Sequence, residues 1–414
     1  MSTARRFAAF AAVSALALTA AACGGGDDEA TTDTSATGTA AATEEVTAEA
    51  PGDDSGDTAG ETEAAGDTGD TATTPTLLEA CGPQVDVQLD WWPQADYGFL
   101  FQLIGPGGTV DADTFSYLGE IGDTGVTLAV HSGGSAVGFQ SSTSLLYKDD
   151  SILLAVTSTE QDAENAVEFP TVAVFTPLQK VPLVFYWGNE EWDFQSLEDI
   201  RDAGVTVITV ESAPYLAVLL ERGLLTEDQI DKSYQGTPAR FVQEDGNVVQ
   251  QGYLTSEVYQ YQYELPEWNK PVKYVLVGNE YPALYHQFSI RKDRLDANRE
   301  CLAQLVPIFQ QAGIDYANDP TDGNAALVET AAGFTGSGWE LSPELLAWAA
   351  PTLVSDGFIA NGEDGAYGSL PLQRFNEFLP ELREALAASG IDISPDLTAE
   401  DFATNEFIDP NLHL

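Results

Sequence analysis

Short β-branched runs alternate with helical segments from residue 85 onward, and this alternation limits the fold more than any other feature of the sequence. Strands are predicted over 85–92, 126–134, 151–161, 171–177, 181–187, 205–210, 274–278 and 286–292. Helices are predicted over 109–122, 135–149, 196–204, 213–225, 296–313, 342–357 and 372–390. Strands that alternate with helices indicate parallel α/β layers rather than a β-sandwich.

The order of these segments predicts two lobes. A first α/β segment ends near Pro177, a second α/β segment follows it, and the residues after Asp296 are mostly helical. This order is typical of a chain that leaves one lobe, builds another and returns. We therefore expect lobe one to comprise 77–177 plus about 280–414, and lobe two to comprise 178–279. Ligands of such proteins bind between the lobes, at the carboxyl ends of the strands.

The first 22 residues have the three parts of a secretory signal. Arg5 and Arg6 precede an apolar run from Phe7 to Ala22, which ends in small residues before Cys23. The run is short and rich in alanine, which disfavours a permanent membrane span. A cysteine after three alanines resembles the end of a bacterial lipoprotein signal, and the resemblance implies cleavage before Cys23 and attachment of lipid, such as palmitate, to it. The alternative is an ordinary signal peptide with an incidental cysteine.

The segment that follows cannot form a packed core. Residues 24–76 contain 14 acidic residues, no lysine or arginine, and no aromatic residue. Such a composition buries too little apolar surface to offset the loss of chain entropy. We expect residues 23–76 to be a disordered acidic tether, and the alternative is an acidic tail that binds another protein.

The charge of the chain excludes some partners. The formal net charge is −50, and 52 acidic residues against 14 basic ones remain after the tether and Arg5 and Arg6 are set aside. A strongly negative protein repels nucleic acid and anionic lipid surfaces. We expect no nucleic-acid partner, and membrane contact only through the lipid anchor.

Two cysteines remain after Cys23, at Cys81 and Cys301. An exported protein with an even number of remaining cysteines is a candidate for a disulfide, because the extracytoplasmic environment is oxidising. We expect Cys81 and Cys301 to pair, and the alternative is two separate buried thiols.

Residues for catalysis and metal binding are scattered. His131, His286 and His413 lie far apart in the sequence and do not form a metal-binding motif. The run 133–138 lacks the spacing of a nucleophile elbow, and the glycines at 105–108 are not followed by the Lys-Ser/Thr of a phosphate-binding loop. We therefore expect no catalytic residue, no bound metal and no cofactor.

Aromatic residues near the predicted strand ends are candidates for ligand binding. Tryptophan and tyrosine combine a flat apolar face with a hydrogen-bonding group, which suits a planar ligand. The aromatic candidates are Trp91, Trp92, Tyr97, Tyr186, Trp187, Tyr215 and Tyr253. Core packing is the alternative for each ring. A strand has a side-chain period of two, so Trp91 and Trp92 are expected on opposite faces, one in the core and one toward the ligand.

Polar residues at the same strand ends complete the candidate site. They are Gln94, Asp96, Ser132, Gly133, Glu211, Ser212 and Glu257. A solvated surface position is the alternative for each carboxylate. An anion site needs arginine, lysine or several aligned N–H groups. The candidates offer carboxylates, amides and rings instead, which favours a neutral or cationic heterocycle.

Several segments together resemble a known family. The run "LDWWPQADYGFLFQ" at 89–102, the element "SLEDIRDAGVTVITV" at 196–210 and the tail at 356–392 are similar to the solute-binding lipoproteins of ABC importers. The group they resemble binds pyrimidine precursors (thiamine-biosynthesis-like), nitrate, sulfonates and taurine. The chain departs from the family pattern at Ala203-Gly204, where the family has Gly-Lys.

The resemblance implies an α/β, two-lobed periplasmic-binding-protein type II-like fold with hinge crossings and a helical C-terminal tail. It also implies a monomer at the outer face of the bacterial cell membrane, which captures a small-molecule solute and passes it to an ABC permease. The solute expected is a small planar heterocycle that is pyrimidine-, thiamine- or flavin-like. The alternatives are a nitrate-, sulfonate- or taurine-type anion, an enzyme derived from the same fold, and a surface lipoprotein that binds a protein.

Overall fold

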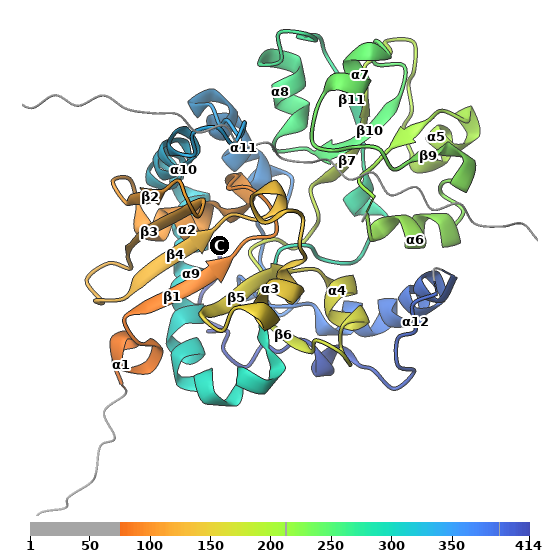
Figure 1. Cartoon of the computed structure of the whole chain (residues 1–414). Helices are drawn as coiled ribbons and strands as arrows, with labels where there is room; N and C mark the ends of the chain where they lie inside the picture. Colours follow the sequence, from red (N-terminus) through yellow and green to blue (C-terminus); the bar gives the residue numbers. More distant parts are fainter. Residues whose placement is uncertain (1–74, 212, 389) are drawn as a thin grey trace, which may run out of the picture. The chain divides into compact units, whose positions relative to one another are not determined.

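A computed structural model of the chain describes residues 75–414, apart from Ser212 and Ser389. The predicted signal, Cys23 and the predicted tether up to residue 74 lie outside these described residues. The described residues belong to one compact unit, shown in Figure 1. No helix among them is both long enough and apolar enough to cross a membrane.

Seven strands form a first sheet, called sheet A, in the order β2-β3-β4-β1-β5-β12-β6. Its strands are β1 (Gln84–Gln88), β2 (Thr109–Asp111), β3 (Ser116–Glu120), β4 (Thr127–His131), β5 (Ile152–Thr157), β6 (Thr171–Phe175) and β12 (Gln287–Arg291). The central strands β4, β1 and β5 are parallel, whereas β3 and β12 run antiparallel to their neighbours. Sheet A is therefore mixed, and only its centre has the parallel arrangement that the alternation predicts.

Five strands form a second sheet, called sheet B, in the order β11-β7-β10-β8-β9. Its strands are β7 (Leu183–Trp187), β8 (Val207–Ile208), β9 (Ile230–Asp231), β10 (Val249–Tyr253) and β11 (Lys273–Leu276). All of them come from one continuous stretch, whereas β12 returns the chain to sheet A. The lobe boundaries near 177 and 279 stay a prediction.

Twelve helices lie among the described residues. They are α1 (Leu77–Cys81), α2 (Gly98–Ile104), α3 (Ser142–Lys148), α4 (Thr159–Glu164), α5 (Leu197–Ala203), α6 (Tyr215–Glu221), α7 (Ala239–Gln243), α8 (Glu257–Tyr263), α9 (Arg299–Asn318), α10 (Thr321–Gly333), α11 (Pro343–Ser355) and α12 (Leu372–Ala388). The sequence pattern did not predict α2, α4, α7, α8 and α10.

The predicted helix over 109–122 is wrong, because β2 and β3 form a hairpin there. The side chain of Asp111 accepts hydrogen bonds from the backbone N–H groups of Asp113 and Thr114, which closes a turn. Phe115 has a φ of 49°, a left-handed conformation that no helix interior contains. The polar residues that resemble a helix start therefore belong to a turn.

Capping explains why α5 begins and ends where the sequence predicts. The hydroxyl of Ser196 accepts the backbone N–H of Asp199, and Asp199 accepts the backbone N–H of Ser196 in return. Gly204 follows the helix with a φ of 63°. Both features stabilise helix ends by satisfying otherwise unpaired backbone groups.

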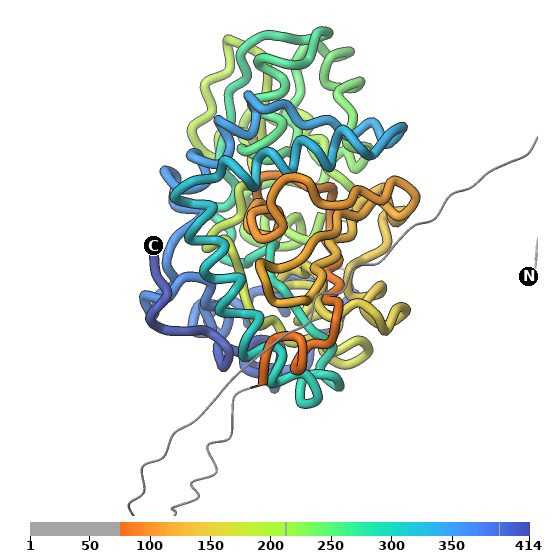
Figure 2. Tube along the Cα trace, turned by 90° about the vertical axis from the view of Figure 1, so that its left-hand side faces the viewer, coloured from red at the N-terminus to blue at the C-terminus, as the bar shows by residue number. Residues whose placement is uncertain are grey.

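The long helix α9 joins the core of sheet A, and Figure 2 follows it as a continuous blue-green coil beside the first strands. Phe309 of α9 packs edge-on against Phe99 of α2 and against Phe175 and Phe288 of sheet A. Burying each such ring contributes about 1.5–3 kcal/mol. The predicted disulfide is confirmed, since Cys81 of α1 is bonded to Cys301 of α9.

A candidate solute-binding cavity

A cavity of about 260 Å³ lies at the carboxyl ends of strands from both sheets. The strands β1, β4 and β5 are parallel, so the segments that follow them meet at one edge of sheet A. From these segments come Asp90, Trp91, Gln94, Tyr97, Gly134, Phe139, Gln140, Ser141, Ser142, Thr157, Ser158 and Gln161. Residues of sheet B and its connections face them, namely Leu183, Val210, Ala213, Pro214, Tyr215, Tyr234, Gln251, Gly252, Tyr253 and Glu257, with Tyr285 before β12.

The two adjacent tryptophans have different positions. Trp91 lines the cavity, and its ring lies 6.1 Å from the ring of Phe139. Trp92 is buried, stacks on Trp339 and donates its indole N–H to Ser135 at 3.0 Å. This is the division into one core ring and one ligand-facing ring that the sequence predicts. Its cause is different, because β1 ends at Gln88 and both tryptophans lie in the bend that follows.

Glycines allow this bend to approach the loop after β4. A Cβ atom on Gly133 would lie 2.4 Å from backbone atoms of Leu89 and Asp90. A Cβ atom on Gly134 would lie 2.9 Å from the indole of Trp91, and Gly134 has a φ of 58°. Side chains at these two positions would push Trp91 away from the cavity.

A hydrogen-bonded carboxylate holds Tyr97 in the cavity wall. The Tyr97 hydroxyl donates to Asp90 Oδ1 at 2.5 Å. Burial raises the pKa of Asp90 to about 6, although the hydrogen bond from Tyr97 acts in the opposite direction. At pH 7 Asp90 is therefore mostly ionised and faces a wall that is rich in rings.

Behind this wall, Asp96 connects the segment after β1 with the segment after β10. Gln94, which lines the cavity, donates its amide N–H to Asp96 Oδ2 at 2.6 Å, and Thr255 donates its hydroxyl to Oδ1 at 3.0 Å. Burial raises the pKa of Asp96 to about 7. Burial also lowers the pKa of the nearby His286 to about 3, so that its imidazole is neutral at pH 7.

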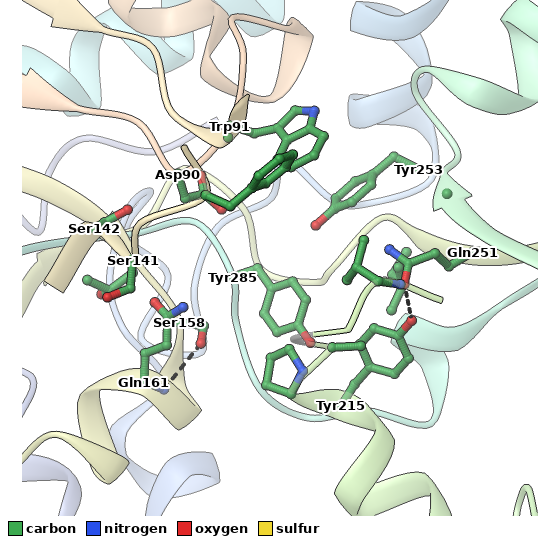
Figure 3. A pocket seen from close by; sticks show the side chains of 18 of the residues that line it. Asp90, Trp91, Ser141, Ser142, Ser158, Gln161, Tyr215, Gln251, Tyr253 and Tyr285 are labelled. Atoms are coloured by element: carbon green, nitrogen blue, oxygen red, sulfur yellow. Dashed lines mark hydrogen bonds between the residues drawn. The ribbon is translucent and has the colours of Figure 1, made fainter. Parts of the chain in front are cut away.

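On the opposite wall, Tyr215 and Gln251 are fixed by a shared hydrogen bond, which Figure 3 shows as a dashed line. Gln251 Oε1 accepts the Tyr215 hydroxyl at 2.7 Å and the backbone N–H of Val210 at 2.8 Å. Glu257 accepts the backbone N–H of Tyr253 at 2.8 Å and the hydroxyl of Ser256. These contacts orient Tyr215 and Tyr253 toward the space in front of Trp91.

Six of the predicted ligand-binding residues line the cavity, namely Trp91, Gln94, Tyr97, Tyr215, Tyr253 and Glu257. Others lie elsewhere. Tyr186 and Trp187 are buried in β7, in aromatic contacts with Phe241 and Phe194 respectively, because β7 is covered on both faces. Ser132 is buried and donates to the backbone of Phe115.

Four further predicted residues are outside the cavity wall. Trp92 belongs to the core, and Asp96 lies behind Gln94. Gly133 does not line the cavity, but its lack of a side chain lets its backbone lie against that of Asp90. Glu211 is exposed. Ser212 lies outside the described residues.

The sequence patterns did not indicate the wall that follows β5 or the residues around Phe139. Thr157 ends β5 and Ser158 follows it, whereas the predicted strand continues to residue 161, so a search of the predicted strand ends would have missed both hydroxyl groups. Phe139 is 61% exposed and has a φ of 59°, a combination that no sequence pattern predicts.

The charge of the wall has one sign. Among the described lining residues, seven are aromatic, Asp90 and Glu257 are acidic, and none is lysine, arginine or histidine. Arg240 of α7 lies outside this wall and pairs with Asp231 and Glu244. Within residues 75–414, Ser212 and Ser389 aside, no group of three or more metal-ligating side chains is present.

Comparison with known proteins supports the fold and leaves the ligand open. No protein-family model matches the chain, and no curated protein matches it. Among solved structures, the alkanesulfonate-binding protein SsuA from Xanthomonas axonopodis pv. citri bound to MOPS is similar over 78% of this chain and 99% of its own, with 13% identity and a TM-score of 0.51.

Two other structures are less similar. A putative periplasmic sulfonate-binding protein SsuA from Methylobacillus flagellatus KT matches over 78% of this chain and 92% of its own, with 12% identity and a TM-score of 0.49. A desulfurization enzyme matches over 78% and 97%, with 10% identity and a TM-score of 0.42.

The predicted fold class is confirmed, since the chain has the α/β fold of the periplasmic binding proteins with a helical C-terminal region. The similar structure with a TM-score of 0.51 is an alkanesulfonate-binding protein, and sulfonates belong to the nitrate, sulfonate and taurine part of the resemblance. The pyrimidine-precursor part stays a prediction.

Proposed function

We propose that this protein is an extracytoplasmic solute-binding protein of an ABC importer, which captures a small planar heterocycle in the 260 Å³ cavity. The observation that carries the proposal is the set of aromatic side chains that face this one cavity from both sheets. The fold and the sequence of the first 23 residues support it. In this proposal Cys23 carries the lipid that anchors the protein to the outer face of the membrane.

The shape of the site suits a flat ligand. Trp91, Tyr253, Tyr285 and Tyr215 surround the same space in Figure 3. Offset and edge-on ring contacts stabilise a planar molecule in such a space by about 0.5–1.5 kcal/mol each beyond area burial. A volume of about 260 Å³ is at the lower end for ligand sites, so a pyrimidine- or thiamine-sized solute fits better than a flavin.

In this proposal a captured ligand contacts both lobes. Lobe one comprises 77–177 plus about 280–414, and lobe two comprises 178–279. A solute that touches Trp91 on one side and Tyr253 on the other favours the closed state over the open one. The protein acts as a monomer, performs no chemistry and delivers the closed complex to a membrane permease.

A sulfonate-type anion is the second candidate. The similar structure bound to MOPS favours it. Asp90 and Glu257 disfavour it, because two carboxylates in the described wall repel an anion and no side-chain cation offsets them there.

Thermal unfolding with a solute panel tests the proposal. The panel contains hydroxymethylpyrimidine, thiamine, riboflavin, taurine, MOPS and nitrate. A heterocycle at 100 times its dissociation constant is expected to stabilise the protein by about 2.7 kcal/mol, with the solute recovered unchanged by mass spectrometry. A shift caused only by sulfonates or nitrate would contradict the planar heterocycle, and turnover of the solute would contradict a pure binding role.

A matched pair of variants locates the binding. Tyr253→Ala removes a ring from the wall, whereas Tyr263→Ala removes a ring that is 64% exposed and outside it. We expect only the first to abolish the ligand-induced shift.

A further inference from the structure

The cavity contains carboxylates without a counter-ion. In many proteins an acidic side chain near a pocket forms an ion pair within the protein. Here neither Asp90 nor Glu257 forms a salt bridge with any residue of the described part of the chain. Asp96, the other acidic side chain close by, has His286 at 3.9 Å as its possible ion-pair partner, and this imidazole is neutral at pH 7. Negative charge in this wall is therefore not neutralised by the protein.

Asp90 has few side-chain partners, although the backbone N–H groups of Asp90 and Trp91 also favour its ionised form. Among the described side chains, Tyr97 alone donates a hydrogen bond to it, and that bond uses Oδ1. Asp90 is neither fully buried nor exposed, and it lines the cavity directly. Asp90 and Trp91 are adjacent in the chain, and both line the same side of the cavity in Figure 3. A ligand in the cavity thus meets an ionised oxygen and a ring face together.

Aromatic faces add a second attraction for positive charge. The π-electrons of tryptophan and tyrosine attract a cation placed over the ring, by about 0.5–2 kcal/mol according to how far water is excluded. Trp91 faces the cavity from one side, and Tyr253, Tyr285 and Tyr215 face it from the other. Each of these rings also has the flat surface that a heterocycle requires.

Building on the proposed function, we propose that the solute is an organic cation whose positive charge lies on the planar ring itself, as in a pyridinium or thiazolium ion. Asp90 pairs with this charge, Trp91 stacks on the ring, and Glu257 contributes a second negative charge from the opposite wall. The class of solute is thereby narrowed from a neutral or cationic heterocycle to a cationic one.

The pairing makes binding depend on pH. Tyr97 donates a hydrogen bond to Asp90. Asp96 and Tyr253 interact with Asp90 electrostatically. Glu257 interacts electrostatically with Asp96 and Tyr253. Since the pKa of Asp90 is about 6 in the free site, a cation must compete with a proton below that pH. Affinity for a cation should fall about tenfold between pH 7 and pH 5, as the fraction of ionised Asp90 falls. A neutral ring of the same shape does not pair with Asp90 and should show no such loss from this residue.

The test compares two probes that differ by one methyl group and one charge. These are 1-methylnicotinamide, a pyridinium cation, and nicotinamide, its neutral counterpart. Titration calorimetry on the chain that begins at residue 24 is expected to show at least tenfold tighter binding of the cation at pH 7.5. Thiamine, a thiazolium cation, and its neutral precursor hydroxymethylpyrimidine form a second pair with the same expectation.

Variants separate the charge of Asp90 from its structural role. Asp90→Asn has the same shape and still accepts the Tyr97 hydroxyl, so it is expected to retain binding of the neutral probe within about threefold. The variant should lose most of its preference for the cationic probe, and its affinity for that probe should no longer depend on pH between 5 and 7. Asp123→Asn, which removes the same charge from an exposed residue outside the cavity, should change neither. Glu257→Gln provides an independent variant from the other wall, and a smaller loss of preference is expected.

The outcomes distinguish the two levels of the proposal. Equal affinity for both members of each pair, or a preference for the neutral member, would overturn the cationic solute and leave the planar heterocycle in place. Binding only of MOPS, taurine or nitrate would overturn both. Loss of both probes in Asp90→Asn with unchanged thermal stability would also count against charge pairing, because it would assign Asp90 a role that does not depend on charge.

Discussion

Two carboxylates with the same shifted pKa, Asp162 and Asp90, have different surroundings. Burial raises the pKa of Asp162 and of Asp90 to about 6. Asp162 is fully buried and accepts hydrogen bonds from Thr157, Thr171, Gln287 and Ser289 at 2.6–3.2 Å. Asp90 accepts one side-chain hydrogen bond from the described residues, from Tyr97, and faces a cavity.

The difference shows how a structural carboxylate can be told from one that is free for a ligand. Asp162 ties β5, β6 and β12 together, so its hydrogen-bonding capacity is used by the protein. Asp90 has capacity left over, at a place where a ligand reaches it. A shifted pKa alone does not separate the two roles, whereas the number of side-chain donors together with access to the cavity does.

The largest effect is expected at Asp162. Asp162→Ala leaves at least three buried donors without an acceptor, since Thr157 and Ser289 can still bond to each other. Each unpaired donor costs about 1–3 kcal/mol, so a total loss of about 5 kcal/mol in unfolding free energy is expected. Urea denaturation measures it. Asp90→Asn, measured in the same way, should lose less than about 1 kcal/mol. Similar losses of unfolding free energy in the two variants would contradict the distinction between a structural Asp162 and a ligand-binding Asp90.

The adjacent tryptophans provide the next test. Trp92→Ala removes a buried ring that packs on Phe115, Phe334 and Trp339, and should cost about 3–5 kcal/mol of stability. Trp91→Ala should cost little stability and abolish solute binding, which thermal unfolding with and without solute detects. Unchanged affinity in Trp91→Ala would exclude this segment from the site.

Glu160 extends the comparison to another deeply buried carboxyl group, whose pKa is raised further than that of Asp162. It is 1% exposed, and neither oxygen has a hydrogen-bond partner within the described residues. Burial raises the pKa of Glu160 from 4.5 to about 8, so the folded state holds its proton more tightly than the unfolded state. Its contribution to stability is therefore complete below pH 4.5 and is lost as the pH rises through 8.

We expect the wild-type protein to lose about 3 kcal/mol from this group between pH 5 and pH 8. Glu160→Gln cannot ionise and should lose correspondingly less, as urea unfolding at pH 5, 7 and 8 would show. The other carboxyl groups with a raised pKa, including Asp90, Asp96 and Asp162, are present in both proteins. Their contributions to the pH dependence of stability therefore cancel when the two profiles are subtracted. Parallel pH profiles for the two proteins would contradict this role of Glu160.

The smallest effect is expected at the contact between Asp96 and Thr255. Thr255→Val keeps the shape of the side chain and removes the hydroxyl that donates to Asp96, so affinity for the solute should fall about fivefold to tenfold, or about 1 kcal/mol. Stopped-flow dissociation should show the loss in the off-rate, because the contact joins the two walls of the cavity. Thr255→Ser restores a hydroxyl and should restore affinity. Failure of the serine variant to do so would assign the effect to packing.

Much of the fold could be predicted, and the site only in part. The capping box at Ser196 and Asp199, the strand predicted over 126–134 and the pair Cys81 and Cys301 are local or compositional signals that the structure reproduces. The hairpin at 109–120 was missed because aspartate and threonine favour helix starts and turns equally. Among the aromatic candidates, Tyr215 and Tyr253 line the cavity whereas Tyr186 and Trp187 are core, and all four stand at similar places in the sequence.

The sequence by itself determined the α/β fold class, the pairing of Cys81 and Cys301 and, as a prediction, the exported character of the chain's first residues. These properties depend on local residue patterns or, for the disulfide, on the count of cysteines. Only the tertiary structure decided that Trp91 rather than Trp92 faces the cavity, and that Asp162 is satisfied where Asp90 is not. The physical reason is that the partners of these side chains come from distant segments: Phe139 lies beside Trp91, Trp339 beside Trp92, and Gln287 and Ser289 beside Asp162.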